Sequence, residues 1–131
     1  MSSKRYSVLI LIVSQIGVLG VWFSSAAVLG EMQAEAGLSA SDLAWLSTAT
    51  QIGFGSGALI YAALGLADRY DPRAVFFLSA CASAGAHALL IWMPVGGTEA
   101  VLLRGLTGAF LAGVYPVGMK IAVGWGTKDR G

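Results

Sequence analysis

Four long runs of apolar residues constrain what this chain can fold into. They cover residues 7–29, 43–67, 74–93 and about 101–125, and short polar segments separate them. A helix needs about 20 apolar residues to cross a bilayer, so each run is long enough for one crossing. We therefore predict an all-α membrane protein in which residues 1–131 form a single domain of four transmembrane helices.

The composition agrees with a multi-pass integral protein and argues against other classes. Of the 131 residues, 56% are hydrophobic and 11% are charged, with a mean hydropathy of +0.75, whereas a soluble domain carries about 25% charged residues. A net charge of +1 gives no reason to expect a nucleic-acid partner. The single cysteine, Cys81, cannot form an internal disulfide. Membrane lipid is the expected surrounding, in the bacterial inner (plasma) membrane.

No group of residues in the sequence points to catalysis. The chain has no paired carboxylates, no metal-ligand cluster and no nucleophile triad, so we expect no enzyme, no cofactor and no metal. His87, alone in the third run, is interpreted as a packing residue rather than a proton carrier.

The basic residues are distributed unevenly along the chain and predict its orientation. The loops at residues 30–42 and 94–100 contain neither Lys nor Arg. The other three polar segments carry six basic residues: Lys4, Arg5, Arg69, Arg73, Lys128 and Arg130. Because basic loops stay on the cytoplasmic side during insertion, both termini are expected to be cytoplasmic.

Polar residues and prolines mark where the expected helices begin. Ser39 and Asp42 stand in the order of a capping box, in which each side chain bonds the backbone N–H of the other. Asp71 and Pro72 precede the third run, and proline suits the first turn of a helix. Thr98 follows a Pro-Val-Gly-Gly turn and is expected to cap the fourth helix.

Small residues recur at four-residue spacing in the second and fourth runs. Close approach of helices in lipid depends on such residues, because apolar surface alone gives little driving force there. The spacing predicts helix–helix seams, and the glycines would also permit bending. The glycines expected to pack the helices are Gly53, Gly57, Gly105, Gly108 and Gly113.

The loop at residues 64–73 carries a recognisable motif, Leu-Gly-Leu-Ala-Asp-Arg-Tyr-Asp-Pro-Arg. It resembles the signature Gly-x-Leu-Ala-Asp-Arg-x-Gly-Arg-Arg that the major facilitator superfamily of transporters has between its second and third helices. Leu64, Asp71 and Pro72 depart from that signature. Five positions match it: Leu66, Ala67, Asp68, Arg69 and Arg73.

The fourth run adds a second resemblance to the same family. Arg104 and Gly108 resemble the Arg-x-x-x-Gly pattern of the family's fourth helix, with Thr107 where Gln is usual. Residues 113–116, Gly-Val-Tyr-Pro, resemble the Gly-x-Tyr-Pro of many members. The resemblance implies that the chain corresponds to helices 1–4 of the family's N-terminal half. Members have twelve helices in two halves around a midplane site, so the resemblance implies a truncated or mini form of a transporter.

The resemblance also implies a gating role for the loop residues Asp68, Arg69 and Arg73. In the family, the acid that matches Asp68 bridges toward the second half and helps to close the cytoplasmic side. The helix that would receive it is not in this sequence. The alternative is a solvated charged loop that only fixes the topology, and both interpretations stay open.

Two basic residues interrupt the fourth run and are candidates for a substrate cavity. An ionisable group at the centre of a span costs about 2.5–3.5 kcal/mol on insertion scales and usually faces a functional interior. Arg104 lies about one turn inside the outer boundary, where its side chain could extend outward toward Glu99. Lys120 lies about one turn from the inner boundary and could extend inward.

The family's first and fourth helices line its cavity, which implies a set of candidates. Arg104 and Tyr115 share one face of the fourth helix, whereas Lys120 points nearly opposite unless Pro116 bends the helix. Gln15 and Trp22 are seven residues apart on one face of the first helix.

Two functions of different class follow from these patterns. One is a secondary transporter that moves a small solute, anionic if Arg104 contacts it, and that self-associates as a dimer because four helices hardly enclose a site and a gate. The other is a non-transporting accessory subunit that descends from such a transporter. It would pack against a larger membrane complex through its small-residue faces.

Two further interpretations are rejected. A signal peptide has an apolar core of about 7–15 residues, and the run at 7–29 is longer. The small multidrug resistance family also has four helices in a chain of this size. It needs a membrane-embedded glutamate in its first helix, and the first run has no acidic residue.

Overall fold

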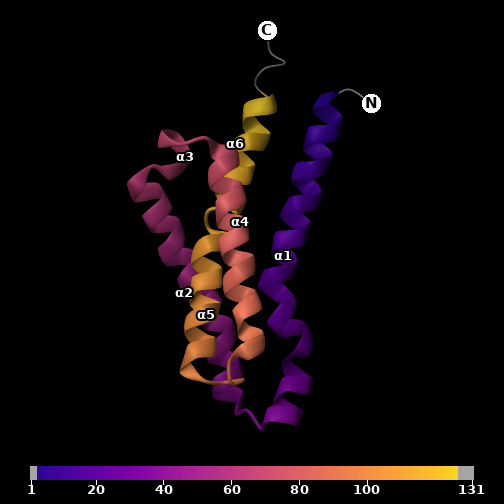
Figure 1. The fold of residues 1–131 in the computed structure, drawn as a ribbon, viewed down its shortest axis with the longest axis vertical. Coiled ribbons are helices and arrows are strands. Elements are labelled where there is room, and N and C mark those ends of the chain that lie inside the picture. Colours follow the sequence, from indigo (N-terminus) through magenta and orange to yellow (C-terminus); the bar gives the residue numbers. More distant parts are fainter. Residues whose placement is uncertain (1–2, 127–131) are drawn as a thin grey trace.

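The computed structural model describes residues 3–126, and this part of the chain is helical and contains no strand. Its elements form four rods: α1; α2; α4 continued by η1; and α5 continued by α6 (Figure 1). Their bounds are α1 Ser3–Ala36, α2 Ala40–Leu64, α3 Leu66–Arg69, α4 Pro72–Ala88, the 3₁₀ turn η1 Leu89–Trp92, α5 Thr98–Leu111 and α6 Tyr115–Gly126.

Three of the rods contain a helix that is long and apolar enough to cross a membrane. These stretches are Arg5–Ser24, Pro72–Trp92 and Thr98–Gly124, with 20, 21 and 27 residues. The second expected span, α2, has 25 residues but is not among them. Its many Ser, Thr, Gln and Gly residues lower its hydropathy. Of the four spans expected from the sequence, three are thus found in the described residues.

The connections between the rods alternate between the two ends of the molecule. The start of α1, the short α3 and the end of α6 lie at one end, and the α1–α2 and η1–α5 connections lie at the other (Figure 1). The basic segments at the start of α1 and around α3 therefore share one end. Lys128 and Arg130, which entered the same orientation argument, lie outside the described residues.

The boundaries of α2 follow from its capping residues, as the sequence predicts. The Asp42 N–H donates to the Ser39 hydroxyl over 3.2 Å, and the Ser39 N–H donates to the Asp42 carboxylate over 3.0 Å. Hydrogen bonds from the Ser39 hydroxyl and then from its backbone N–H lower the pKa of Asp42. Gly65 ends the helix with φ 58°, a left-handed conformation that glycine adopts without strain.

The beginning of α4 is also as predicted, whereas the beginning of α5 is not. Asp71 caps α4 by accepting the Arg73 N–H over 2.9 Å, and Pro72 occupies the first turn. At α5 the expected cap was wrong. Gly97 is the N-cap residue, Thr98 is the first helical residue, and no side chain bonds the cap.

A seam of small residues brings the backbones of α2 and α5 into close contact. A Cβ atom added at Gly53 would overlap the carbonyl oxygen of Gly105. One added at Gly57 would lie 2.7 Å from the Cα of Ala109. Both neighbours are backbone atoms, which side-chain rotation cannot move. Glycine at these two positions therefore lets the two helix backbones touch.

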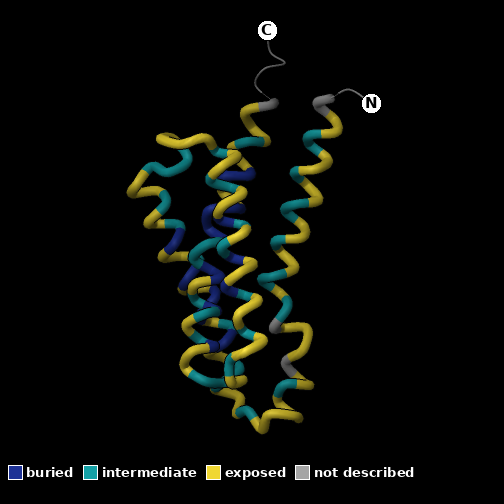
Figure 2. The backbone as a smooth tube through the Cα atoms, in the orientation of Figure 1, coloured by how far each residue is buried: buried dark blue, intermediate teal, exposed yellow. Residues whose placement is uncertain are grey.

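The same packing continues toward α4 and α6. A Cβ at Gly108 would overlap the carbonyl oxygen of Thr50, and one at Gly113 would overlap the side chains of Ser79 and Tyr61. The hydroxyls of Tyr61 and Ser79 are hydrogen-bonded to each other over 2.7 Å, which ties α2 to α4. The buried residues gather in α2, α4, α5 and α6 (Figure 2).

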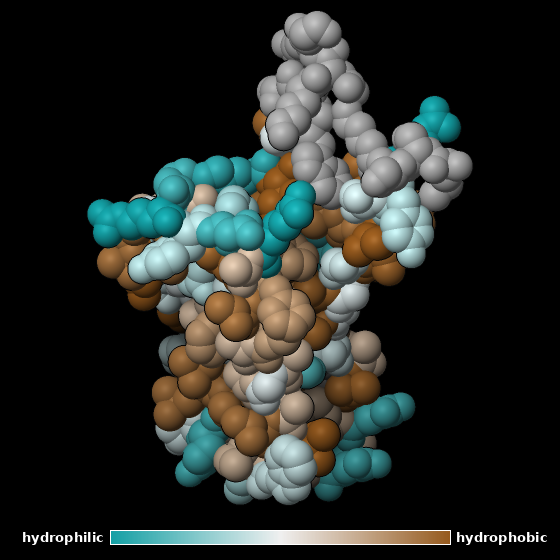
Figure 3. Space-filling model, turned by 45° about the horizontal axis from the view of Figure 1, so that its top comes forward, coloured by the Kyte–Doolittle hydropathy of each residue, from teal (hydrophilic) through white to brown (hydrophobic). Residues whose placement is uncertain are grey.

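The long helix α1 packs more loosely than the rest. No residue of its Arg5–Ser24 stretch is buried (Figure 2), and many of its apolar residues, such as Leu9, Val13 and Ile16, are exposed on the isolated chain. In the face that Figure 3 shows, hydrophilic residues gather toward the two ends and hydrophobic residues lie between them. A band of this kind is what contact with lipid requires.

Candidate functional site

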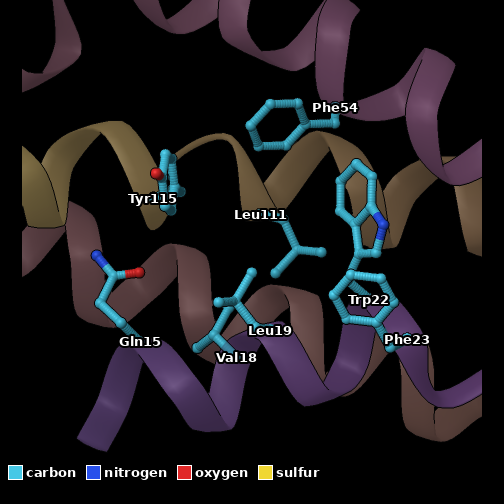
Figure 4. Close-up of a pocket in the computed structure, with 8 residues that line it drawn as sticks. All are labelled: Gln15, Val18, Leu19, Trp22, Phe23, Phe54, Leu111 and Tyr115. Atoms are coloured by element: carbon cyan, nitrogen blue, oxygen red, sulfur yellow. The ribbon is translucent and has the colours of Figure 1, made fainter. Parts of the chain in front are cut away.

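A cavity of about 200 Å³ lies between α1, α2 and the rod formed by α5 and α6 (Figure 4). Three of the five cavity candidates line it: Gln15 and Trp22 from α1, and Tyr115 from α6. Their side chains come together because α1 leans on the rod near the break between α5 and α6. The other lining residues are Val18, Leu19, Phe23, Phe54 and Leu111.

Polar and aromatic residues stand at opposite ends of this cavity, although the surface it presents is almost entirely apolar. Figure 4 shows the Gln15 amide and the Tyr115 hydroxyl at one end and the rings of Trp22 and Phe54 at the other. These two rings pack edge to face, with centroids 5.3 Å apart and planes at 83°. Such a pair contributes about 0.5–1.5 kcal/mol beyond the area it buries. The Gln15 amide nitrogen donates to the carbonyl of Val114 over 3.5 Å, which ties α1 to the rod.

Arg104 is buried in the helix bundle, and its guanidinium joins α5 to α1 and α2. Only 2% of this residue is exposed. Its Nε donates to the carbonyl of Leu46 over 3.4 Å. Its two Nη atoms donate to the carbonyls of Val21, over 3.4 Å, and Trp22, over 3.3 Å. A planar group with five donors can bond several acceptors at once, which a lysine cannot do.

A fourth hydrogen bond from Arg104 reaches α4 and determines which ring nitrogen of His87 carries the proton. The arginine only donates, so His87 Nδ1, at 3.4 Å, accepts. In the neutral ring the proton then lies on Nε2, which donates to the Ser24 hydroxyl over 3.0 Å. Ser24 in turn donates to the Val21 carbonyl over 2.9 Å. The four rods are thus joined by one polar cluster, in which His87 is a bonded packing residue.

These bonds correct the expected path of the Arg104 side chain. The guanidinium does not extend outward to Glu99, and among the described residues no carboxylate pairs with it. Three backbone carbonyls and His87 accept from four of its five N–H groups, in place of water. Neither Arg104 nor Lys120 is among the residues that line the cavity.

The loop residue Asp68 has a partner within this chain. The Lys120 ammonium of α6 bonds the Asp68 carboxylate and also donates to the carbonyl of Ala67 over 2.7 Å. Lys120 therefore points toward the end of the molecule at which α3 lies. There its bonds link the loop at residues 64–73 to α6. Arg69 and Arg73 are exposed in α3 and in the first turn of α4.

Sequence reasoning missed several residues of the cavity and of the polar cluster. Val18 and Leu19 stand three and four residues after Gln15 on the face already marked by Trp22, so helical spacing could have identified them. No comparable signal pointed to Phe54 or to Ser24, because their roles depend on which helices meet.

One comparison with known proteins gives a match over most of the chain. The sequence model of the Major Facilitator Superfamily matches residues 10–131, which include most of α1 and all of the other described elements. A comparison with curated proteins and one with solved structures gave no match. Members of the matched family are membrane transporters rather than enzymes, in agreement with the three apolar helices. The chain therefore belongs to the Major Facilitator Superfamily.

Proposed function

We propose that this chain is a secondary transporter of a small solute and that the cavity between α1, α2 and the α5–α6 rod is part of the solute's path. The observation that carries the proposal is the convergence of Gln15, Trp22 and Tyr115 on one cavity between three rods. Transporters of this family bind substrate near the bilayer midplane at the interface between repeats. A cavity between apolar helices, away from both ends of the bundle, is compatible with a substrate site at that depth.

We propose further that α2 crosses the membrane as the fourth span, with both termini cytoplasmic. At 1.5 Å per residue, its 25 residues reach about 37 Å, more than the hydrocarbon core of about 30 Å. Two of its polar side chains have partners in the protein: the Ser56 hydroxyl donates to the Ile52 carbonyl over 2.7 Å, and the Thr50 hydroxyl donates to the Leu46 carbonyl over 3.5 Å. The uneven distribution of basic residues supports this orientation, in the inner membrane of a bacterium.

We propose that a second copy of this chain covers the open side of the cavity and so completes the solute's path. The described helices enclose the cavity only partly, and Leu19 and Phe23 at its edge are exposed. The two halves of full-length carriers are related by a pseudo-two-fold axis along the membrane normal. A symmetric dimer would reproduce that relation and cover this edge.

Native mass in lipid nanodiscs tests the self-association. We expect a dimer in which Leu19→Glu, at the exposed edge of the cavity, weakens association. The matched control Leu59→Glu lies on α2 outside the cavity, is 74% exposed, and should leave the dimer intact. A monomer under gentle extraction would overturn the dimer.

Thiol labelling tests the path without knowledge of the solute. Cys81, which is exposed on α4, is first replaced by Ser. Gln15→Cys and Tyr115→Cys are then treated with a membrane-impermeant maleimide in sealed vesicles. Maleimides react with thiolates, which form in water and not in lipid. Labelling at both positions and none at Leu59→Cys is expected. Absence of labelling at positions 15 and 115 would contradict a solute path.

The accessory-subunit alternative gains no observation from the structure. It relied on small-residue faces as docking surfaces for a larger complex. The glycines Gly53, Gly57 and Gly108 instead contact other helices of the same chain. Those faces are therefore occupied within the described bundle.

A further inference from the structure

We infer that the polar cluster around Arg104 is a latch that acid opens, because a proton on His87 Nδ1 and the hydrogen bond from Arg104 to that nitrogen exclude each other. The inference goes beyond the proposed solute path and does not depend on it. Three observations carry it: the hydrogen-bond roles within the cluster, the charges that face His87, and the bonds that hold α1.

The hydrogen bonds of the cluster leave His87 one place for an incoming proton. Ser24 donates its hydroxyl hydrogen to the Val21 carbonyl over 2.9 Å, so its oxygen accepts from His87 Nε2, 3.0 Å away. The neutral ring therefore carries its hydrogen on Nε2 and a lone pair on Nδ1. That lone pair already accepts from the Arg104 guanidinium over 3.4 Å. A second ring proton would thus turn one N–H donor against another.

The charges around His87 add to this conflict. Among the described residues, Arg104 of α5 is the charged group that faces the ring. α1 presents the Ser24 hydroxyl, α2 presents the Leu46 carbonyl to the same guanidinium, and η1 contains no titratable residue. No acidic side chain in this part of the chain bonds Arg104 or His87. A protonated His87 would therefore stand beside a second cation with no anion between them.

The helix α1 divides its bonds in this cluster between two other helices. The carbonyls of Val21 and Trp22 accept from Arg104 on α5, and Ser24 accepts from His87 on α4. When Arg104 and His87 separate, α1 cannot keep both sets of bonds. We expect it to stay with α5, to which it has two bonds rather than one. Acid therefore loosens α4 from α5 and α1 at this level and leaves Trp22 in place.

A proton can reach the latch from one end of the molecule. His87 is half-buried. Arg104 stands six residues after Thr98, where α5 begins, which is about 9 Å along the helix axis. The η1–α5 and α1–α2 connections lie at that end (Figure 1). The proton comes from water there, forms an N–H bond at Nδ1 and returns to water when the pH rises.

Because the closed latch has no place for the second ring proton, acid favours the open state. An imidazole in contact with water takes up a proton at about pH 6.5. The advantage of the closed state is therefore complete above about pH 7.5 and is lost progressively as the pH falls below about 6.5. From pH 8 to pH 5, the ratio of open to closed molecules should rise about thirtyfold.

Histidine-selective ¹⁵N NMR of the chain in nanodiscs shows where the proton is. His87 is the single histidine of the sequence, so one pair of ring signals is expected. At pH 8 the signals should be those of the neutral ring with its hydrogen on Nε2. At pH 5 they should be those of the doubly protonated ring.

Spin labels show whether the latch opens with that proton. Cys81 is first replaced by Ser, and labels are attached to cysteines at the exposed positions Leu89 of η1 and Leu102 of α5. A second pair joins Val28 of α1, also exposed, to Leu102. Between pH 8 and pH 5 the distance distribution of the first pair should broaden, and that of the second pair should stay as it is.

The variant His87→Asn supplies the matched control. Its amide offers an acceptor to Arg104 and a donor to Ser24 but takes up no proton in this pH range. It should give the closed distribution at both pH values. His87→Gln, with a longer amide side chain, takes its place if thermal unfolding at pH 8 shows that His87→Asn is not folded. Ser24→Ala removes only the bond to α1 and should keep the acid response between η1 and α5.

Three results would overturn the inference. One is a ring that stays neutral at pH 5 in the folded chain. Another is a doubly protonated ring with an unchanged distance between η1 and α5. The third is equal broadening in the unchanged chain and in the amide variant, which would give the opening another cause. No solute enters these measurements, so none of the three results bears on the proposed path.

Discussion

The buried guanidinium of Arg104 donates to the backbone carbonyl of Trp22 over 3.3 Å, and the ring of that same Trp22 lines the cavity. The cation of α5 thus holds the loosely packed α1 at the residue that forms the aromatic end of the candidate site. Arg104 acts on the cavity through α1, as a positioning residue, rather than by touching a ligand.

Arg104→Lys should loosen α1 while keeping the positive charge. An ammonium on a flexible stem cannot bond α1, α2 and α4 together. The three bonds to the carbonyls of Leu46, Val21 and Trp22 are the ones at risk. At about 0.6 kcal/mol for an interhelical bond, their loss lowers the free energy of unfolding by about 2 kcal/mol. Reversible unfolding in a detergent mixture measures this change.

A distance measurement separates this loosening from general damage. Spin labels on the exposed Leu9 of α1 and Leu78 of α4 should give a broader distance distribution in Arg104→Lys than in the unchanged chain. Arg69→Lys, an exposed change of the same kind, serves as the control and should leave the distribution as it is. Equal distributions in all three chains would refute the positioning role.

Gly53→Ala should separate α2 from α5, whereas Gly55→Ala should not. The added methyl group at Gly53 meets the Gly105 backbone, and nothing lies within 4 Å of a Cβ at Gly55. Overpacking of this kind costs about 1–3 kcal/mol. In a helix interior, Gly to Ala is otherwise favourable by about 0.5–1 kcal/mol. Thermal unfolding should rank Gly55→Ala at or above the unchanged chain and Gly53→Ala below it. The same melting temperature for both variants would count against the seam.

The Asp68–Lys120 pair should contribute little to stability and should respond to salt. The two side chains are 79% and 45% exposed, and exposed pairs contribute about 0–1 kcal/mol. Asp68→Asn and Lys120→Gln should each cost less than about 1 kcal/mol at low salt, and the double variant less than their sum. In 1 M salt the coupling should disappear. Full additivity at low salt would mean that the pair does not form.

The capping box predicts a pH dependence at the start of α2. Because hydrogen bonds from Ser39 lower the pKa of Asp42 below its ordinary 3.8, the folded chain binds this proton more weakly than the unfolded chain. The contribution of the ionised Asp42 carboxylate to the stability of the folded chain is therefore complete at neutral pH. It is lost as the pH falls through the folded-state pKa of Asp42. The melting-temperature difference between the unchanged chain and Asp42→Asn should be constant from pH 7 to about 5 and shrink below about pH 4.

The double variant Ser39→Ala/Asp42→Asn, compared with Ser39→Ala alone, supplies the control for that experiment. In a Ser39→Ala background the hydrogen bond from the serine side chain is gone, so the pH dependence of the Asp42→Asn difference should be smaller. A difference that stays the same at all pH values in both backgrounds would rule out the capping contribution.

Local features of this fold could be predicted from the sequence. The capping box at Ser39 and the proline start at Pro72 depend on residues within one turn of each other. The break between α5 and α6 falls where Pro116 lacks a backbone donor. The shared face of Gln15 and Trp22 follows from helical spacing alone.

Most features that the sequence did not predict depend on which helices meet. Arg104 stands 82 residues from Trp22. No local pattern indicates that a carbonyl of α1, rather than the nearby Glu99, accepts its hydrogen bond. Lys120 extends inward as expected, but its partner Asp68 lies 52 residues away, and no local pattern indicates that pairing. The error at Thr98 is local: the N-cap position falls one residue earlier, at Gly97.

The central claim is that the cavity lies on a solute path, and two-sided accessibility of Tyr115→Cys tests it most directly. An impermeant thiol reagent is applied to the outside of sealed vesicles in one sample and loaded inside in another, with Cys81 replaced by Ser. A carrier that exposes its site alternately should be labelled from both sides, while Leu59→Cys is labelled from neither. Labelling from only one side, or from neither, would contradict the account.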